Sequence, residues 1–468
     1  MPEASGIIER VRAEGIKVVD FRFTDLVGRW RHVAREATRL EADTLRDGIL
    51  IDGSAIPGWR DVTESDLLLK PDLASAFLDP FSAQPTLVLI GDGAEPGTGL
   101  GYERDPRSAA VRAEAYLRSF RQADEVQIAV ELDFFLLDEI KVELGPLHAG
   151  YRLAVGEHAS TAARGGGGRE GHRPQPDAAY LAAPPADHLA DIRAEIASVL
   201  GELGFAGVEH AHGRGSGQNE LSFGTGTLVA TADRLQLAKY VVHQVAASYG
   251  KAATFMPKPI LDQAGSGLHV HASLWQGGKP VFAGQGYADL SPLCLHFVAG
   301  VMQHARALNA FTNPTTNSYK RLAPNQDEPT VLAYAAHNRS AAVRIPYAAR
   351  APAKRVEVRF PDPSANPYLA FTAILMAGLD GIERKLEPGD ALDRNLYDLR
   401  PEEALDLTSV SRSLGQALEA LEADHDFLTR GDVLPPDLIQ AYIAVKRREC
   451  ELVDRTPHPL EFQLYLGL

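Results

Sequence analysis

The sequence contains very little cysteine: only Cys294 and Cys450 occur in 468 residues. Two cysteines so far apart provide neither a disulfide framework nor a metal-binding pair of the CxxC type. The N-terminal stretch Met1–Arg10 is interrupted by charged residues, so it does not have the apolar core of a secretory signal. These features predict a reducing, cytoplasmic setting.

Long apolar runs and runs of basic residues are also missing. No uninterrupted apolar stretch reaches the roughly 20 residues that span a bilayer. The formal charge is −15, which disfavours non-specific binding to nucleic acid. The sequence therefore predicts neither a membrane nor a nucleic-acid partner. The content of 45% hydrophobic and 23% charged residues is that of a globular protein.

The chain divides most naturally near residue 100. Strands are predicted at Ile16–Phe23, at Trp30–Ala34 as its partner, and at Leu87–Ile90. We therefore predict an N-terminal domain over 1–100 and a larger domain over 101–468. In the larger domain, apolar spacing predicts helices over Ala232–Ala247, with Thr231 as N-cap, and over Pro292–Ala310.

One predicted strand carries two carboxylates on the same face. Val126–Leu137 alternates and then becomes apolar, as a buried strand does, and Glu131 and Asp133 are two residues apart. Like charges on one buried face repel unless a cation lies between them. The alternative is a half-exposed strand with a solvated acidic face.

A second charged strand follows later in the chain. Arg355, Glu357 and Arg359 alternate with apolar residues, so the three charges share one face. This pattern fits a cleft that holds a cation on the carboxylate and anions on the guanidinium groups. It also fits a solvated edge strand with an ordinary ladder of ion pairs.

Histidines occur in two alternating pairs. His210 and His212 have the spacing of zinc ligands on a strand, but no CxxC or HxxxH motif accompanies them. His269 and His271 follow a glycine turn and share one face of a strand, where they could contact metal or phosphate. A lone histidine is more often a satisfied core residue.

Basic residues cluster within 40 positions of this acidic chain. Clustered arginine suits the capture of phosphate or carboxylate, provided that the side chains converge in space. The residues are Lys320, Arg321, Arg339, Arg344, Lys354, Arg355 and Arg359.

From about residue 16 to the C-terminus the chain resembles bacterial type I glutamine synthetases. The resemblance rests on several motifs in the same order: IDGSAIPGW (51–59), SGQNE (216–220), GSGLHVHASL (265–274), NPTTNSYKRL (313–322), HNRSAAVRIP (337–346), EVRFPDPSANPY (357–368) and NLYDL (395–399). It implies an α+β fold with a small β-grasp-like N-terminal domain and a large catalytic domain built on a curved antiparallel sheet with flanking helices. It also implies a homo-oligomer of stacked hexameric rings, a dodecamer, with active sites between neighbouring subunits.

The resemblance implies ATP-dependent joining of glutamate to ammonia or a small amine through a γ-glutamyl phosphate, with Mg²⁺ or Mn²⁺. It assigns Glu131, His269 and Glu357 to one metal ion, and Asp133 and Glu220 to a second, where His212 takes the place of a third ligand. It assigns Gly265, Arg321 and Arg359 to the amino-acid substrate, Arg339, Arg344 and Arg355 to phosphate, and His271 and Ser273 to the nucleotide. On the ammonium side it places Tyr180 and, from the neighbouring subunit, Asp52, with Asp327 at the position of a flap glutamate.

The chain departs from the family mainly on the ammonium side. His212 replaces a carboxylate, Ala264 replaces an asparagine, Asp327 replaces glutamate with Glu328 beside it, and the flap segment 177–183 is altered. Oxygen-preferring Mg²⁺ should bind less well beside an imidazole.

Three functional alternatives follow from this resemblance. We expect a γ-glutamyl ligase, with both ammonia and a small amine open as acceptor. The competing class is a non-catalytic paralogue that acts as an oligomeric regulator or scaffold. The guanidino kinases, which share a related fold, fit the Asp52 loop and NPTTNSYKRL poorly. Tyr397, in NLYDL, matches a tyrosine that some members adenylylate.

Overall fold

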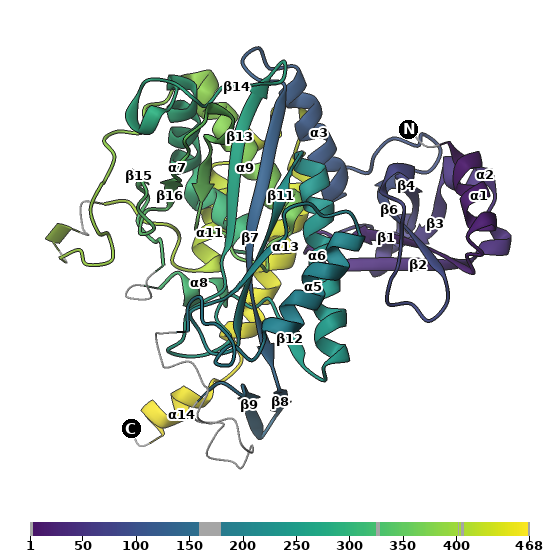
Figure 1. Cartoon of the computed structure of the whole chain (residues 1–468), viewed down its shortest axis with the longest axis horizontal. Coiled ribbons are helices and arrows are strands. Elements are labelled where there is room, and N and C mark those ends of the chain that lie inside the picture. Colours follow the sequence, from purple (N-terminus) through teal and green to yellow (C-terminus); the bar gives the residue numbers. More distant parts are fainter. Residues whose placement is uncertain (1–2, 159–178, 324–327, 401, 404–406, 467–468) are drawn as a thin grey trace.

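The computed structural model describes residues 3–158, 179–323, 328–400, 402–403 and 407–466. A smaller N-terminal part projects from one side of a larger part, and the two ends of the chain lie far apart (Figure 1). Asp327 and the first two residues of the predicted flap segment, Asp177 and Ala178, lie outside the described residues.

The N-terminal part is a six-stranded sheet with two helices beside it. The strand order is β2-β1-β6-β4-β3, with β5 paired to β6, and only β1 and β6 run parallel. The predicted pairing of the first two strands is confirmed. The elements are α1 (Ala4–Ala13), β1 (Val18–Thr24), β2 (Trp30–Glu36), α2 (Ala42–Asp47), β3 (Ile49–Asp52), β4 (Asp66–Pro71), β5 (Phe77–Leu78) and β6 (Thr86–Ala94).

The larger part is organised around a nine-stranded sheet. Its order is β10-β11-β7-β13-β17-β16-β15, with β12 paired to β7 and β14 to β13. All its pairs are antiparallel except β15 with β16, which confirms the expected sheet type. The strands are β7 (Glu125–Leu137), β10 (Glu209–His212), β11 (Gln218–Gly226), β12 (Ala252–Thr254), β13 (Leu268–Gln276), β14 (Lys279–Pro280), β15 (Tyr334–Ala336), β16 (Val343–Ile345) and β17 (Val356–Val358), and a separate hairpin joins β8 (Glu139–Gly145) and β9 (His148–Ala154).

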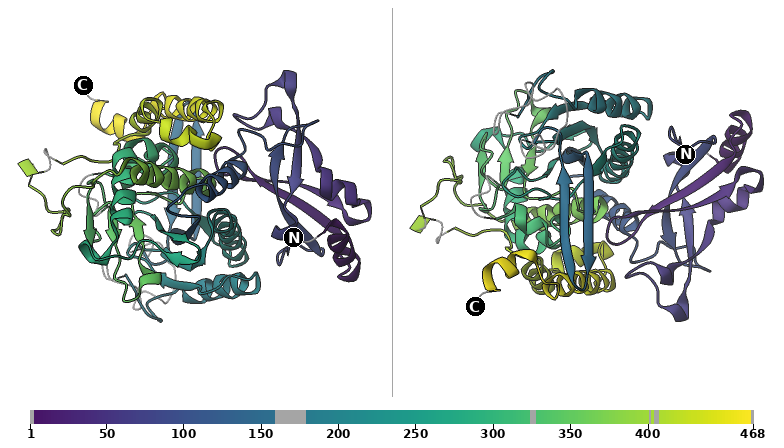
Figure 2. Two further views of the ribbon diagram at one scale, coloured as in Figure 1. Left: turned by 90° about the horizontal axis from the view of Figure 1, so that it is seen from above. Right: turned by 90° about the horizontal axis from the view of Figure 1, so that it is seen from below.

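Helices pack beside this sheet. Figure 2 shows α13 and α5 on opposite sides of the larger part. The helices are α3 (Pro106–Arg118), α5 (Ala190–Glu202), α6 (Leu228–Ser248), α7 (Pro292–Thr312), α8 (Ser318–Arg321), α9 (Pro367–Arg384), α11 (Leu414–Ala423), α12 (Asp426–Thr429), α13 (Pro436–Asp454) and α14 (Pro459–Tyr465). No helix within the described ranges is both long and apolar enough to cross a bilayer.

The helices α7 and α9 cross very closely because both carry glycine at the crossing. A Cβ on Gly300 would lie 2.1 Å from the carbonyl oxygen of Ala377, and one on Gly381 would lie 2.2 Å from that of His296. Such distances leave no room for a side chain, so these glycines permit backbone contact in the core.

The long strand β7 sets the two faces of the large sheet. Residues from Val126 to Phe134 alternate strictly between buried and partly exposed, and the even-numbered residues are the buried ones. Glu131 and Asp133 therefore share the open face, as predicted from the sequence. The opposite face packs into the main core through Val130 and Leu132.

A buried arginine joins the N-terminal sheet to the larger part. Arg107 on α3 forms ion pairs with Asp72 and Asp92 of the small part and with Asp233 of α6. The guanidinium is almost fully buried, so its N–H donors bond to carboxylates instead of to water. These carboxylates come from both the small part and the large part. This contact fixes the small part against α3 and α6.

Two sequence expectations about element boundaries are wrong. Helix α6 begins at Leu228 with Thr227 as its N-cap, whereas Thr231 lies inside the helix and donates its hydroxyl to the carbonyl of Ile128. The predicted strand Arg355–Phe360 is shortened to β17, because β13 pairs with it only over Val356–Val358 and β16 only at Val358 and Glu357. The charge alternation was visible in the sequence, but the extent of pairing was not.

Candidate active site

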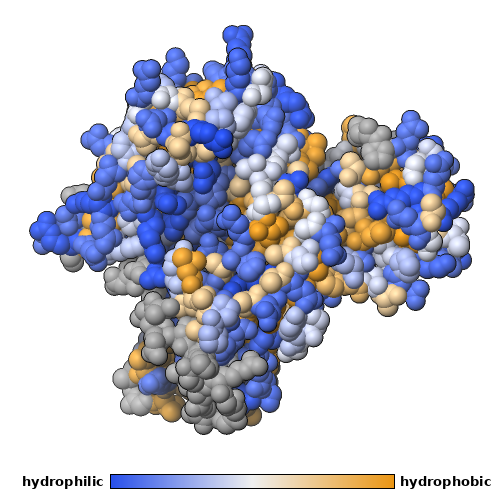
Figure 3. Space-filling model, in the orientation of Figure 1, coloured by the Kyte–Doolittle hydropathy of each residue, from blue (hydrophilic) through white to orange (hydrophobic). Residues whose placement is uncertain are grey.

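The open face of the large sheet borders a cavity of about 660 Å³. The area between β13 and β15 is recessed and strongly hydrophilic in Figure 3. Ten predicted site residues line the cavity: Glu131, Asp133, Tyr180, Glu220, Gly265, His269, Arg321, Arg339, Arg344 and Arg359.

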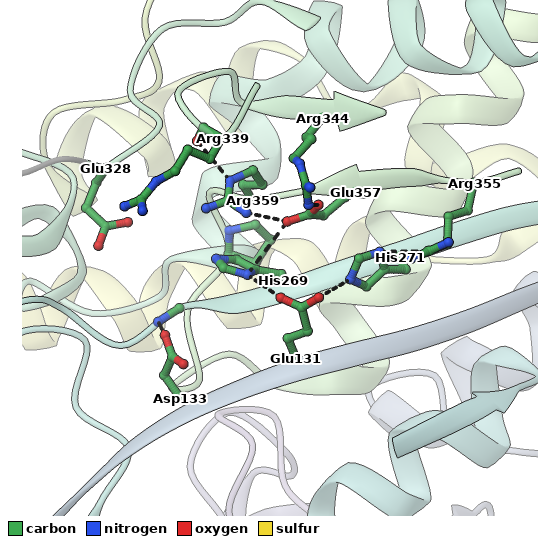
Figure 4. A network of polar contacts seen from close by, with 12 residues as sticks. Glu131, Asp133, His269, His271, Glu328, Arg339, Arg344, Arg355, Glu357 and Arg359 are labelled. Atoms are coloured by element: carbon green, nitrogen blue, oxygen red, sulfur yellow. Dashed lines mark hydrogen bonds and ion pairs between the residues drawn. The ribbon is translucent and has the colours of Figure 1, made fainter. Parts of the chain in front are cut away.

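A cluster of two carboxylates and two histidines forms across three adjacent strands. Glu131 of β7 lies opposite His269 of β13, and His271 lies opposite Glu357 of β17. Oε2 of Glu131 is 3.0 Å from Nδ1 of His269, and Oε1 is 3.0 Å from Nε2 of His271. Nδ1 of His269 is also 3.7 Å from Glu357. Figure 4 shows these side chains pointing toward one another.

The charges of this cluster favour ionised carboxylates. Burial alone disfavours the charged form of Glu131, but hydrogen bonds from His269 and His271 lower its pKa. For Glu357, burial is likewise outweighed by Arg359 and the two histidines, and its pKa is also lowered. Glu131, His271 and Glu357 offer ligand atoms within 4.8 Å of one another, a spacing that fits a cation.

A second pair of carboxylates lies beside the first. Asp133 of β7 is the cross-strand partner of Glu220 of β11. Burial and the neighbouring Glu220 raise the pKa of Asp133 well above its usual range. The pKa of Glu220 is raised by burial and by Glu131. This mutual repulsion among oxygen donors fits a second divalent cation, because a positive charge would remove it.

Arginine side chains form the opposite wall. Arg344 donates to Glu357 over 2.7 Å, and Arg359 also pairs with Glu357. Arg321 is 1% exposed and donates to the carbonyls of Phe360 and Pro361. Four of the seven clustered cations therefore converge on this cavity, namely Arg321, Arg339, Arg344 and Arg359, whereas Lys320, Lys354 and Arg355 do not line it.

Glycine is required beside Arg321. A Cβ on Gly265 would lie 2.8 Å from Cγ of Arg321 and 2.8 Å from the carbonyl of Pro257. The same glycine accepts a hydrogen bond at its carbonyl from Gln218. Gly265 thus allows Arg321 to lie against the cavity wall.

The residues expected to face the nucleotide lie along β13, beyond the cavity. His271 accepts a hydrogen bond from Arg355 at Nδ1 and contacts Glu131 through Nε2. Ser273, two residues further, accepts one from Trp275. His271, Ser273 and Arg355 do not line the 660 Å³ cavity, but His271 contacts Glu131, which does line it.

Two predicted residues lie elsewhere. Asp52 is exposed on the N-terminal part, where it borders a separate cavity of about 530 Å³ with Trp30, His32 and others. Its carboxylate accepts hydrogen bonds from Ser54, which lower its pKa. His212 is buried and pairs with Glu157 instead of facing the cavity. The third position expected at the second metal is therefore not filled by this side chain.

Several cavity residues were not selected from the sequence. Arg214, Gln218 and Asp262 line the cavity together with Glu328, the residue next to Asp327. Arg214 lies in the glycine-rich turn that joins β10 to β11, and Gln218 is the first residue of β11. The signal for Arg214 in the sequence was its position as a charged residue between two glycines, shortly before the strand that carries Glu220.

The chain is similar to glutamine synthetases in sequence and in structure. Residues 15–96 match the family model "Glutamine synthetase, beta-Grasp domain", and residues 103–465 match "Glutamine synthetase, catalytic domain". It is 48% identical to the glutamine synthetase of Rhizobium meliloti over 469 residues, covering 100% of both chains. It is 47% identical to the glutamine synthetase of Escherichia coli K12, and the match covers 99% of this chain and 100% of the relative.

Solved structures agree with the sequence comparisons. The cryo-EM structure of Plasmodium falciparum glutamine synthetase matches with a TM-score of 0.89 at 25% identity, over 99% of each chain. The structure titled "Apo GmaS without ligand" matches with a TM-score of 0.83 at 30% identity, again over 99% of each chain. The predicted α+β fold with a β-grasp N-terminal domain is thereby confirmed.

Proposed function

Because the chain belongs to the glutamine synthetase family and is an ATP-dependent ligase, we propose that it makes glutamine from glutamate and ammonia. The terminal phosphate of ATP is transferred to the γ-carboxylate of glutamate, and ammonia then displaces phosphate from the γ-glutamyl phosphate. The observation that carries this proposal is the pairing of Glu131 with His269 and His271, beside Glu357, along an arginine-lined cavity.

Two sets of residues are suited to Mg²⁺ or Mn²⁺. Glu131, His269 and Glu357 would hold one cation, with His271 also within reach of it, and Asp133 and Glu220 would hold the other. When bound, these cations neutralise phosphate charge and align the transfer. The raised pKa values of Asp133 and Glu220 support the assignment, since a metal-free pair of buried carboxylates is strained by repulsion.

The arginines position the two anionic substrates. Arg321 and Arg359 bind the carboxylates of glutamate, with Gly265 near its amino group. Arg339, Arg344 and Arg355 bind phosphate, and His271 and Ser273 face the nucleotide. A planar guanidinium can donate two parallel hydrogen bonds to a carboxylate or a phosphate, which fixes the direction of attack.

The ammonium side is completed by a neighbouring subunit. Tyr180 lines the cavity, and Asp52 of an adjacent copy accepts the proton of the incoming ammonium. Asp52 is exposed at the end of β3 and borders the separate cavity of the N-terminal part, which supports a shared site in a dodecamer of two stacked hexameric rings. Asp327 completes the proposed catalytic residues. The domains are 1–100 and 101–468, and the setting is cytoplasmic.

A small organic amine is the second candidate acceptor. Its support is the position of His212, which leaves the acceptor side of the cavity without the carboxylate that the family has there. A carboxylate attracts ammonium, so its loss leaves more room for an amine that binds by apolar contact.

One assay decides between these acceptors. Purified protein with ATP, glutamate and Mg²⁺ or Mn²⁺ is given ammonia or one of a panel of primary amines, and released phosphate and γ-glutamyl products are measured. We expect glutamine with ammonia. A product only with an amine supports the second candidate. Absence of phosphate release and of γ-glutamyl hydroxamate with hydroxylamine would contradict both and favour the non-catalytic paralogue.

A further inference from the structure

A second buried cluster of possible metal ligands lies outside the cavity. It consists of Glu157 just after β9, Asp187 just before α5, and His212 at the end of β10. Each is at most 6% exposed, and together they offer ligand atoms within 4.8 Å of one another. Neither the catalytic cluster nor the cavity lining includes any of them.

The ring of His212 has its tautomer fixed by the main chain. Nδ1 lies 2.8 Å from the carbonyl oxygen of Gly213. A carbonyl can only accept, so Nδ1 carries a proton. Nε2 then points its lone pair at Oε2 of Glu157, which is 3.0 Å away. Two lone pairs at this distance require a positive charge between them, which is either a second proton or a metal ion.

The hydrogen bonds of the two carboxylates favour a metal ion over a proton between His212 and Glu157. Oε2 of Glu157 accepts from the amide of Gly217 over 2.8 Å, but Oε1 is buried without a hydrogen-bond partner among the described residues. A buried carboxylate oxygen without a partner is rare in folded proteins. Asp187 is oriented by Arg193 and by the amide of Leu189. Metal-bound carboxylates and histidines are commonly held by such outer hydrogen bonds.

We propose that Glu157, Asp187 and His212 bind a transition-metal ion such as Zn²⁺ at a site separate from the catalytic cations. One imidazole and two carboxylates form a donor set that suits zinc. Arg193 balances the charge of Asp187. A second proton on the ring of His212 would balance the charge of Glu157, so this proton is the alternative to a metal ion. In that case the cluster is a buried pair of ion pairs and holds no metal.

The site would stabilise the acceptor side of the cavity. The carbonyl of His212 accepts a hydrogen bond from Leu181, which follows the cavity residue Tyr180. Glu157 holds the amide of Gly217, which directly precedes the cavity residue Gln218. One metal ion would therefore fix two cavity-lining segments relative to each other.

The test is the zinc content of the intact protein. Full-length protein is stripped with a chelator, incubated with Zn²⁺, desalted and analysed for metal. Wild type is compared with His212→Gln and Glu157→Gln. His210→Gln is the matched control, since His210 lies on the same strand with an exposed side chain. His269→Gln is included to remove zinc bound at the catalytic cluster, so that the remaining zinc reports on the proposed site.

We expect His212→Gln and Glu157→Gln each to lose one zinc per chain, while His210→Gln retains it. His269→Gln should also retain this ion. Zinc should raise the melting temperature of the His269→Gln protein but not of the protein that also carries Glu157→Gln. Because Glu157→Gln preserves shape, it serves even if His212→Gln does not fold. Equal zinc in wild type and both site variants would overturn the proposal and identify His212 as a protonated ion-pair partner. Neither readout depends on ligase activity.

Discussion

The carboxylate of Glu328 lies 2.8 Å from the guanidinium of Arg321, inside the cavity. Arg321 is almost fully buried, and its other contacts include the carbonyls of Phe360, Pro361 and Arg359. In the proposed function, Arg321 binds a carboxylate of glutamate. An internal carboxylate therefore occupies a donor that the substrate needs.

Glu328→Gln should bind glutamate more tightly than wild type. Removing the competing charge releases Arg321, and a charge-assisted hydrogen bond of about 1.4 kcal/mol corresponds to roughly a tenfold decrease in KM. Steady-state kinetics at saturating ATP measure this change, with Glu328→Asp as the control that keeps the charge. A large decrease in kcat at unchanged KM would instead assign Glu328 to the chemistry.

Glu357→Gln should abolish ligase activity. Glu357 is fully buried between Arg344, Arg359 and the histidine cluster, so its loss removes one negative charge from the proposed metal site. A loss of several kcal/mol of transition-state stabilisation corresponds to roughly a 10³-fold decrease in kcat. Glu143→Gln, in the exposed hairpin, is the control. Full activity of Glu357→Gln under Mg²⁺ would contradict the metal assignment.

Gly265→Ala should raise the KM for glutamate. The added Cβ would lie 2.8 Å from Cγ of Arg321 and from a main-chain carbonyl, so Arg321 must move. We expect a loss of about 1–3 kcal/mol in substrate binding. Gly201→Ala in α5 is the matched control, because a Cβ there meets no atom within 4 Å. Equal KM values for the two variants would show that Arg321 does not position glutamate.

His304 should make the stability of the protein depend on pH. Burial alone lowers its pKa, but hydrogen bonds to Asp424 and Asp380, over 2.7 and 2.9 Å, outweigh burial and raise it. A raised pKa means that the folded state binds the proton more tightly. This stabilisation is complete below the ordinary pKa of about 6.5 and is lost as pH rises through the folded-state pKa.

Melting temperatures of wild type and His304→Gln, measured from below pH 6.5 upward through the folded-state pKa of His304, check the prediction. Arg384 and Arg430 also pair with Asp380, so part of the carboxylate charge stays balanced in the variant. We expect His304→Gln to be less stable by roughly 3 kcal/mol at low pH, with the difference narrowing as pH rises. His425→Gln is the control, since its ring contacts main-chain carbonyls. A difference that widens with pH would reverse the sign of our argument.

The sequence by itself determined which side chains share a face. In β7 the two-residue period placed Glu131 and Asp133 together, and in β13 it did the same for His269 and His271. The motifs likewise established the family and the α+β fold. These properties are local or shared with relatives, so a single chain reveals them.

Only the tertiary structure decided which faces meet. Strand register set Glu131 opposite His269 and Asp133 opposite Glu220, across more than 80 positions of sequence. It also turned His212 toward Glu157 and away from the cavity, although His212 is only eight residues from Glu220. Periodicity determines the direction of a side chain relative to its own strand, whereas its neighbours depend on segments that pack there from elsewhere in the chain.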